Sequence, residues 1–379
     1  MHCLVCRSAQ LELLGMAGIK AASVTSDAAV SGFAPKIYCC RQCGHLQKIH
    51  SPREQEEIRS VYENYEIYPF TQGGEPLVYL DNGPPKTRTF HALESCLPYL
   101  PAKGKLLDFG AGNGPVTRSA SLLLPEWELF AYDLGDKYRK DILGVPGVKG
   151  FFTGSLTQIP VKSFDLIVLW HSLEHLPDPA AILSQLRELL REDGRVLIQV
   201  PDFRRTPFDL AVIDHCSHFT KECLSQLCRK SGLAVVKDGE SWTHNCITFL
   251  LKKTPVIAKQ ITDNRSPDAK RLFEWLNRAV AFFESTANRR DYALFGVGIS
   301  SFWLFGQLTR KPLCFVDMDK RSVGHKIESI PIFFPNEISA GLDIFMPFTR
   351  PSGEKIVGKI TRKYPSIPIE RFVFSPSDF

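Results

Sequence analysis

Short apolar runs alternate with helical patterns over the middle of the chain. Five apolar runs of strand length begin at about residue 104, namely "KLLDFG", "ELFAYD", "VKGFF", "FDLIVLW" and "RVLIQVP". Between them lie stretches such as "PAAILSQLRELLRED", in which apolar residues recur at helical spacing. Strands that alternate with amphipathic helices predict an α/β fold whose parallel sheet is covered by helices on both faces.

The pattern changes after the fifth strand. A helical stretch, "KECLSQLCRKSG", is followed by two further strand candidates, "LAVVKD" and "NCITFLLKK", which the turn-like "GESWTH" joins. Two strands joined by such a turn predict a hairpin. The sequence therefore predicts a Rossmann-like sheet of seven strands with one antiparallel strand at its end.

The last third of the chain predicts a helix and a second α/β unit. Helical spacing in "AKRLFEWLNRAVAFFES" favours a linker helix over residues 254–285. The stretch "YALFGVGISSFWLFGQL" then gives a strand, a turn at Gly296 and Gly298, and a helix, before a second strand in "PLCFVDMD". As a dinucleotide site this unit is weak, because Ser301 replaces the third glycine.

Composition narrows the class of protein. The 379 residues are 44% hydrophobic and 23% charged, with a net charge of +5. This weak basicity, without a Lys/Arg-dense stripe, argues against nucleic acid and suits a small anionic substrate. No apolar run reaches the roughly 18–20 residues of a membrane helix, and the first residues do not have the pattern of a secretory signal. We expect a cytoplasmic protein.

Cysteines gather near the start of the chain. Cys3 and Cys6 form one C-x2-C pair, and Cys40 and Cys43 form another. Two such pairs can surround one zinc ion with four thiolates, and four protein ligands leave no position for a substrate. The sequence therefore predicts structural Zn²⁺, with Cys39 or His45 as alternative ligands.

A glycine-rich turn follows the first strand. In "LLDFGAGNGP" the glycines Gly110, Gly112 and Gly114 have GxGxG spacing, whereas the dinucleotide fingerprint has GxGxxG. The glycines let the backbone turn sharply and approach a ligand. Asp133 ends the second strand, where a carboxylate can accept hydrogen bonds from both hydroxyls of a ribose. The spacing disfavours an NAD-linked oxidoreductase.

Together, "DFGAGNG", "AYD", "FDLIVLWHSLEHLPDP" and the closing hairpin resemble a class I S-adenosylmethionine (SAM)-dependent methyltransferase. The resemblance implies that the glycines lie against the methionine part of SAM and that Asp133 holds its ribose. The cofactor-binding residues that it implies are Asp108, Gly110, Ala111, Gly112, Gly114, Asp133, Leu134, Ser155, Leu156, Trp170, His171 and Ser172. One departure is Ser155, because many relatives carry an aspartate there to hold the adenine amine.

The order of the segments resembles the three-part sugar C-methyltransferases, which methylate nucleotide-linked keto-deoxysugars. "FVDMDKRSVG", "IPIFFPNEI" and the paired tyrosines of "VYENY" add to this likeness. It implies a zinc-binding domain over 1–70, a methyltransferase domain over 71–253, the linker helix over 254–285 and a Rossmann-like α/β domain over 286–379. The implied acceptor is a small, carbohydrate-like molecule.

The stretch "DHCSHFT", from Asp214 to Thr220, concentrates titratable side chains after the fifth strand. Residue types alone allow a metal site, an acid/base site or neither. Because the thiolate pairs lie far upstream and Cys216 has no C-x2-C partner, an acid/base segment is favoured. Replacing His218 by alanine or asparagine tests this against a purely structural role.

The resembled C-methyltransferases carry a Tyr-x-Glu-His cluster at this place. Here His215 stands for its tyrosine, Ser217 for its glutamate and His218 for its histidine. Without the glutamate, we favour methyl transfer to an oxygen or nitrogen, with His218 as base and Asp214 or His215 assisting. His175 is either a proton acceptor or a packing element. C-methylation through a rearranged His215/His218 pair and a non-catalytic scaffold that only binds SAM stay open.

Overall fold

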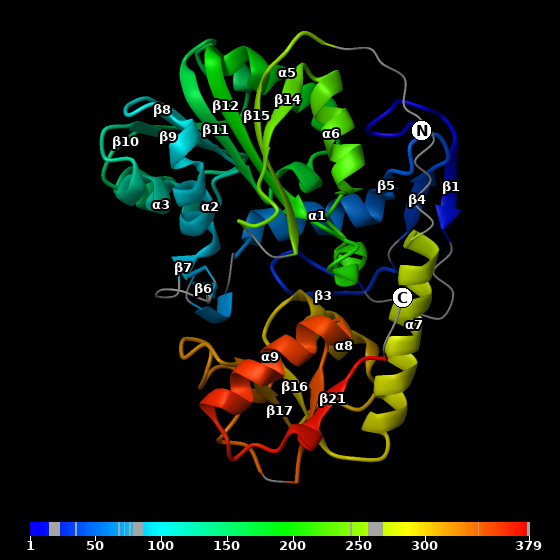
Figure 1. The fold of residues 1–379 in the computed structure, drawn as a ribbon. Coiled ribbons are helices and arrows are strands. Elements are labelled where there is room, and N and C mark those ends of the chain that lie inside the picture. Colours follow the sequence, from blue (N-terminus) through cyan, green and yellow to red (C-terminus); the bar gives the residue numbers. More distant parts are fainter. Residues whose placement is uncertain are drawn as a thin grey trace.

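The computed structural model shows two lobes (Figure 1). The upper lobe holds the largest sheet and the lower lobe holds the end of the chain. Helix α1 (Pro52–Asn64) lies at the lower end of the upper lobe, and α7 (Asp268–Ala287) runs down one side. The structure describes residues 1–14, 23–34, 36–66, 69–71, 73–75, 77–78, 86–242, 245–256, 268–339 and 341–376.

The predicted seven-stranded sheet is confirmed, with the order β10-β9-β8-β11-β12-β15-β14. All its neighbouring strands are parallel except those that pair with β15. Its strands are β8 (Lys105–Phe109), β9 (Glu128–Asp133), β10 (Val148–Thr153), β11 (Phe164–Trp170), β12 (Leu190–Pro201), β14 (Leu233–Asp238) and β15 (Cys246–Lys253).

Helices cover both faces of this sheet, as the alternating pattern predicts. Residues of α2 and α3 share an apolar cluster with one face, while residues of α5 and α6 share another with the opposite face. The burial of β11 on both faces explains why its last five residues, "LIVLW", are continuously apolar. The helices are α2 (Arg88–Cys96), α3 (Pro115–Leu123), α4 (Arg139–Leu143), α5 (Pro179–Leu189) and α6 (Lys221–Lys230).

Two details of this sheet differ from the sequence prediction. The helix expected through "LLRED" ends at Leu189, because Leu190 is extended and fully buried, and it pairs with Phe164 as the start of β12. The antiparallel strand is also not at the edge. It is β15, which lies between β12 and β14, so that the apolar "CITFLL" is buried.

A smaller sheet joins the start of the chain to the segment after β12. Its order is β1-β4-β5-β13, and all its pairs are antiparallel. The strands are β1 (Leu11–Leu14), β4 (Ile37–Cys40), β5 (Leu46–Lys48) and β13 (Ser217–His218). Part of "DHCSHFT" is therefore a strand of the N-terminal sheet, which the sequence did not indicate.

The lower lobe contains a six-stranded sheet in the order β18-β19-β17-β16-β20-β21. Its strands β19, β17, β16, β20 and β21 run parallel. The strands are β16 (Tyr292–Phe295), β17 (Cys314–Val316), β18 (Lys326–Ile327), β19 (Ile330–Phe333), β20 (Asp343–Met346) and β21 (Phe372–Phe374), with the helices α8 (Ile299–Gln307) and α9 (Arg350–Lys363).

One apolar core connects the lobes. It combines residues of the N-terminal sheet, of the segment 203–212, of α7 and of α8, with Trp275 and Trp303 as its largest buried side chains. The helix expected over 254–285 begins at Asp268, and residues 257–267 lie outside the described part of the chain. Among the described helices, none has the length and hydropathy that crossing a membrane requires.

Short elements complete the fold. The two-stranded pairs are β2 (Ser23–Val24) with β3 (Val30–Ser31) and β6 (Leu77–Val78) with β7 (Lys86–Thr87). The 3-10 turns are η1 (Pro69–Thr71), η2 (Leu97–Tyr99), η3 (Leu156–Gln158), η4 (Leu173–His175), η5 (Pro207–Ala211) and η6 (Ile369–Arg371).

Candidate active site and cysteine cluster

The glycine-rich turn lies at the carboxyl end of β8. Gly110, Gly112 and Gly114 all have left-handed backbones, with φ of 78°, 50° and 83°. A Cβ on Gly110 would lie 2.7 Å from the Cβ of Ser172, so this position has no room for a side chain. The turn ends at α3, which begins with Pro115 at its first position.

Asp133 faces this turn from the end of β9. Its Oδ2 accepts a hydrogen bond of 2.7 Å from the backbone N–H of Gly112, and its Oδ1 accepts a long one, 3.4 Å, from that of Gly135. The side chain is part-buried. A turn without side chains beside a carboxylate at the neighbouring strand end fits the methionine and ribose parts of SAM.

Asp108 occupies a different place from the other predicted cofactor residues. It is 1% exposed, and its Oδ2 accepts hydrogen bonds from the N–H and the hydroxyl of Thr117 in α3. Burial raises the pKa of Asp108 to about 7, against the opposing effect of those hydrogen bonds. The geometry assigns Asp108 to holding α3 against β8.

The remaining predicted cofactor residues lie around the same strand ends, with different surroundings. Trp170 packs into the apolar cluster of α2 and α3, and Ala111 is buried below the turn. Ser172 donates to the carbonyl of Phe109 at 3.1 Å. Leu134 is 71% exposed, and Ser155 accepts from the N–H of Thr157, ahead of Leu156 in η3.

His171 forms an ion pair with Glu174 near these strand ends. Its Nδ1 lies 3.1 Å from Oε1 of Glu174, and its Nε2 lies 3.9 Å from Sγ of Cys246. Burial acts against the charged ring, but Cys246 and Glu174 outweigh it and raise the pKa of His171 to about 10. His171 is therefore held in place by buried Glu174.

The four predicted zinc ligands come together. Sγ of Cys3 lies 3.5 Å from Sγ of Cys43, and Sγ of Cys6 lies 3.4 Å from Sγ of Cys40. All four sulfur atoms are within 4.8 Å of one another. Zinc–sulfur bonds of about 2.3 Å in a tetrahedron place sulfur atoms roughly 3.8 Å apart, so this donor set fits Zn²⁺.

The alternative ligands lie outside this cluster. Cys39 directs its thiol at the carbonyl of Cys40, 3.8 Å away. His45 is buried, packs against Phe219 with ring centroids 5.3 Å apart, and has no hydrogen-bond partner for either ring nitrogen within the described residues. The sulfur positions therefore favour the ligand set Cys3, Cys6, Cys40 and Cys43.

The histidine that we expected to act as base is enclosed on both sides. His218 is 1% exposed. Its Nδ1 lies 2.6 Å from Oδ2 of Asp209, and its Nε2 lies 2.8 Å from Nζ of Lys48. Burial and the Lys48 charge lower the pKa of His218 to about 3, although Asp209 opposes this. With both nitrogens engaged, His218 cannot reach an acceptor in this arrangement.

His215 shares the same carboxylate. Its Nδ1 lies 2.6 Å from Oδ1 of Asp209, and no described residue is hydrogen-bonded to its Nε2. Burial alone would raise the pKa of Asp209, but His215 and His218 lower it well below its ordinary value. An ionised carboxylate that holds one ring nitrogen leaves the other able to accept a proton.

His175 meets His215 from η4. The two rings are perpendicular, with centroids 4.6 Å apart. Nδ1 of His175 lies 3.3 Å from Oδ2 of Asp214 and 2.9 Å from the hydroxyl oxygen of Tyr62. Burial opposes the charged ring, but Asp214 outweighs it and raises the pKa of His175. His175 is therefore suited to donate a hydrogen bond to a bound acceptor.

The elements explain how these groups meet. Helix α1 begins with a capping box between Ser51 and Glu54 and carries Tyr62 on its last turn. Asp214 is fully buried and accepts hydrogen bonds from the N–H and the hydroxyl of Ser26. The predicted residues His175, Asp214, His215 and His218 therefore form one cluster, with His218 at its closed end.

Sequence reasoning missed Asp209 and Lys48. Asp209 lies in the apolar "PFDLAVID" and is 5% exposed, so an acid within an apolar run was its only signal. Lys48 lies in a strand of the N-terminal sheet.

Two groups of side chains in this cluster are also close enough to hold a cation: Glu174, His175 and His215, and Asp209, His215 and His218. The second is already joined by hydrogen bonds, so we treat the cluster as an acid/base network.

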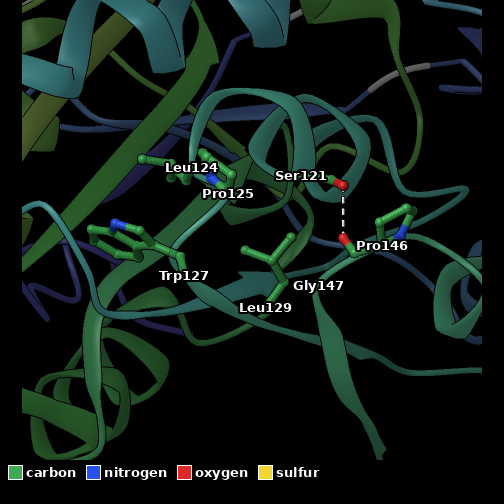
Figure 2. A pocket seen from close by; sticks show the side chains of 7 residues that line it. All are labelled: Ser121, Leu124, Pro125, Trp127, Leu129, Pro146 and Gly147. Carbon is green, nitrogen blue, oxygen red and sulfur yellow. Dashed lines mark hydrogen bonds between the residues drawn. The ribbon is translucent and has the colours of Figure 1, made fainter.

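A surface hollow lies elsewhere on the sheet. Figure 2 shows it between the end of α3 and the start of β9, lined by Trp127, Leu129 and Pro146 among others. Ser121 donates to the carbonyl of Pro146 across it at 2.6 Å. Because Leu129 and Asp133 are at opposite ends of β9, this hollow is remote from the glycine turn.

Comparison with known proteins agrees with this geometry. Residues 85–238 match a family model described as a methyltransferase domain. They include the glycine turn, Asp133 and the segment from Asp209 to His218. The enzyme class expected from the sequence is thereby supported, because residues 85–238 have the pattern of a methyltransferase domain. No curated protein matches the chain.

Solved structures similar to the chain include other methyltransferases. The mitomycin 7-O-methyltransferase is 14% identical, with a TM-score of 0.37, over 44% of this chain and 53% of its own, so the chain spans about half of it. The 1,6-didemethyltoxoflavin-N1-methyltransferase of Burkholderia thailandensis, solved with S-adenosylhomocysteine, is 18% identical, with a TM-score of 0.37, over 55% and 96%. A TehB-like SAM-dependent methyltransferase of Corynebacterium glutamicum is 20% identical, with a TM-score of 0.36, over 54% and 100%.

Proposed function

We propose that this enzyme transfers a methyl group from SAM to an oxygen or nitrogen of a small, saccharide-like acceptor, with His215 as the base. The observation that carries the proposal is the hydrogen bond between Asp209 and His215, 2.6 Å long, beside His175 at the carboxyl ends of the strands. Ligands of such folds bind at these strand ends.

The division of work follows from the chemistry. When bound at the glycine turn and Asp133, SAM would supply an activated methyl group, whose bond to sulfur would break with the electron pair staying on sulfur. The new bond forms to the acceptor atom, whose proton passes to Nε2 of His215. Asp209 holds Nδ1 of the same ring, and His175 donates a hydrogen bond to the acceptor. A positioned base typically contributes about 100- to 10,000-fold.

We prefer an oxygen or nitrogen as the methylated atom because Ser217 stands where the sugar C-methyltransferases have a glutamate. Ser217 is 1% exposed, and its hydroxyl has no hydrogen-bond partner within the described residues. A hydroxyl does not act as a base at neutral pH. His215 is therefore the one proton acceptor of the cluster that can face the molecule to be methylated. C-methylation at the same His215 is the alternative.

We also propose that Cys3, Cys6, Cys40 and Cys43 hold a structural Zn²⁺. The four thiols fill a tetrahedral set, which leaves the metal no position for a substrate.

The test compares His215→Asn with His218→Asn and with His325→Asn, an exposed histidine of the lower lobe. Release of S-adenosylhomocysteine is measured over a panel of nucleotide sugars and saccharides, and SAM affinity by calorimetry. We expect H215N to keep SAM affinity and lose about 100-fold or more of turnover, and H325N to change neither. SAM binding without turnover on any acceptor would support the scaffold instead, and full turnover by H215N would remove His215 as base.

A further inference from the structure

The acid/base segment is held by the N-terminal sheet. Ser217 and His218 pair with Gln47 and Leu46, and the N–H of Lys48 donates to the carbonyl of Cys216 at 2.9 Å. The segment that carries His215 therefore depends on β5 for its backbone position. Lys48 is the last residue of β5, and its side chain extends into the cluster itself.

The ammonium group of Lys48 has three hydrogen-bond donors and meets three acceptors. Nζ lies 2.5 Å from the carbonyl oxygen of Val212, 3.4 Å from that of His215 and 2.8 Å from Nε2 of His218. The residue is 5% exposed. Two of these contacts fix the backbone on either side of Asp214, and the third reaches an imidazole.

Asp209 and Lys48 together determine which nitrogen of His218 carries the proton. Nδ1 lies 2.6 Å from the Asp209 carboxylate, which can only accept, so Nδ1 carries the hydrogen. Nε2 must then accept, and the Lys48 ammonium supplies the donor. A neutral His218 held in this form keeps Oδ2 of Asp209 occupied and directs Oδ1 towards His215.

We infer that Lys48 is a positioning residue for the methyl transfer: together with Asp209 it fixes the tautomer of His218, and the fixed ring in turn holds the Asp209 carboxylate, which orients His215 as base. The inference rests on the proposed role of His215. It assigns the N-terminal segment a part in the chemistry of the site that η4 and the segment after β12 form.

A purely structural Lys48 would stabilise the chain without affecting the His218 proton. The first test is therefore made on the unaltered protein, by nitrogen-15 NMR of its histidines. We expect His218 to be neutral with hydrogen on Nδ1 from pH 6 to 8. Hydrogen on Nε2 or a charged ring in that range would overturn the inference without any variant.

The second test uses Lys48→Met, which keeps an unbranched side chain one atom shorter and removes the donors, and Lys48→Arg as the conservative variant. We expect K48M to lose about 10- to 100-fold in kcat, to bind SAM within about twofold of the unaltered protein, and to show a mixture of His218 tautomers. K48R, which retains donors, should recover part of kcat.

A double variant separates this inference from the proposed function. If Lys48 acts through His215, K48M should cost nothing further in the H215N background. Full additivity of the two losses would overturn the inference while leaving His215 as base. Full turnover by H215N alone would instead remove the proposed function, whatever K48M does.

Discussion

The backbone N–H of Gly112 donates to Oδ2 of Asp133 at 2.7 Å, so the glycine turn and the end of β9 hold each other in place. Replacing Asp133 by alanine should weaken SAM binding by about 10- to 100-fold, because hydrogen bonds to a charged group are worth about 1.5–3 kcal/mol. The SAM affinity of Asp133→Asn should lie between that of D133A and that of the unaltered protein.

Calorimetry with SAM measures this effect. Asp136→Ala is the matched control, since Asp136 is exposed three residues further along the same loop. An affinity of D133A equal to that of the unaltered protein would mean that the ribose is held elsewhere.

Gly110 and Gly154 separate two costs of a side chain in the SAM-binding half of the sheet. Both have left-handed backbones, with φ of 78° and 76°, but a Cβ has open space at Gly154 and meets Ser172 at 2.7 Å at Gly110. Gly154→Ala should cost about 1–2 kcal/mol in free energy of unfolding through backbone strain alone. Gly110→Ala should cost more and should also weaken SAM binding. Urea unfolding of both variants checks this, and equal losses would contradict a clash with Ser172.

The sequence predicted those parts of the fold that local pattern determines. The strands from "KLLDFG" to "RVLIQVP" and the closing hairpin follow from periodicity, and the turn at Gly110 follows from residues that adjoin it. The pairing of Ser217 with Gln47 joins positions 170 residues apart, and no periodicity encodes such a pairing.

The sequence likewise predicted only part of the candidate active site. His175, Asp214, His215 and His218 were recognised by residue type, and they do meet. The choice of His218 as base depended on its surroundings, which Asp209 and Lys48 supply. An aspartate within an apolar run and a lysine at the end of a short strand give no sign of which histidine they will touch, so the burial of both nitrogens of His218 could only be seen in the structure.

The cysteine cluster gives a prediction about the metal and the acid/base segment together. We expect one zinc per chain by mass spectrometry of the digested protein. Cys40→Ser should lose it, and Cys39→Ser should retain it, because the thiol of Cys39 lies outside the cluster.

Loss of the metal should reach the active site through β5 and β13. Cys43 adjoins β5, and its carbonyl accepts a hydrogen bond from the thiol of Cys223 in α6 at 3.3 Å. We therefore expect chelation to lower kcat and near-ultraviolet circular dichroism while SAM affinity changes little. Chelation that abolishes SAM binding at the same rate as turnover would contradict this route.

Lys48 gives a prediction in which stability and turnover change with pH in opposite directions. Burial lowers the pKa of Lys48 from 10.5 to about 8, although Asp209, Asp214 and Cys216 oppose the shift. Between about pH 8 and 10.5 the unfolded chain then binds more protons at this residue than the folded chain. Stability from this group therefore rises with pH there, by up to about 1.4 kcal/mol per unit.

Turnover should fall over the same range, because a neutral amine no longer donates to all three acceptors and the His218 tautomer is released. The measurement is the free energy of unfolding of the unaltered protein minus that of K48M, together with kcat, from pH 7 to 10. Subtracting K48M removes the titration of groups that do not interact with Lys48. The titratable groups that face Lys48 are Asp209, Asp214, Cys216, His218 and His50. Burial raises the pKa of Cys216 to about 11, and His218 stays neutral over this range. A difference that stays level above pH 8, or a kcat that does not fall there, would show that the Lys48 ammonium does not hold the network.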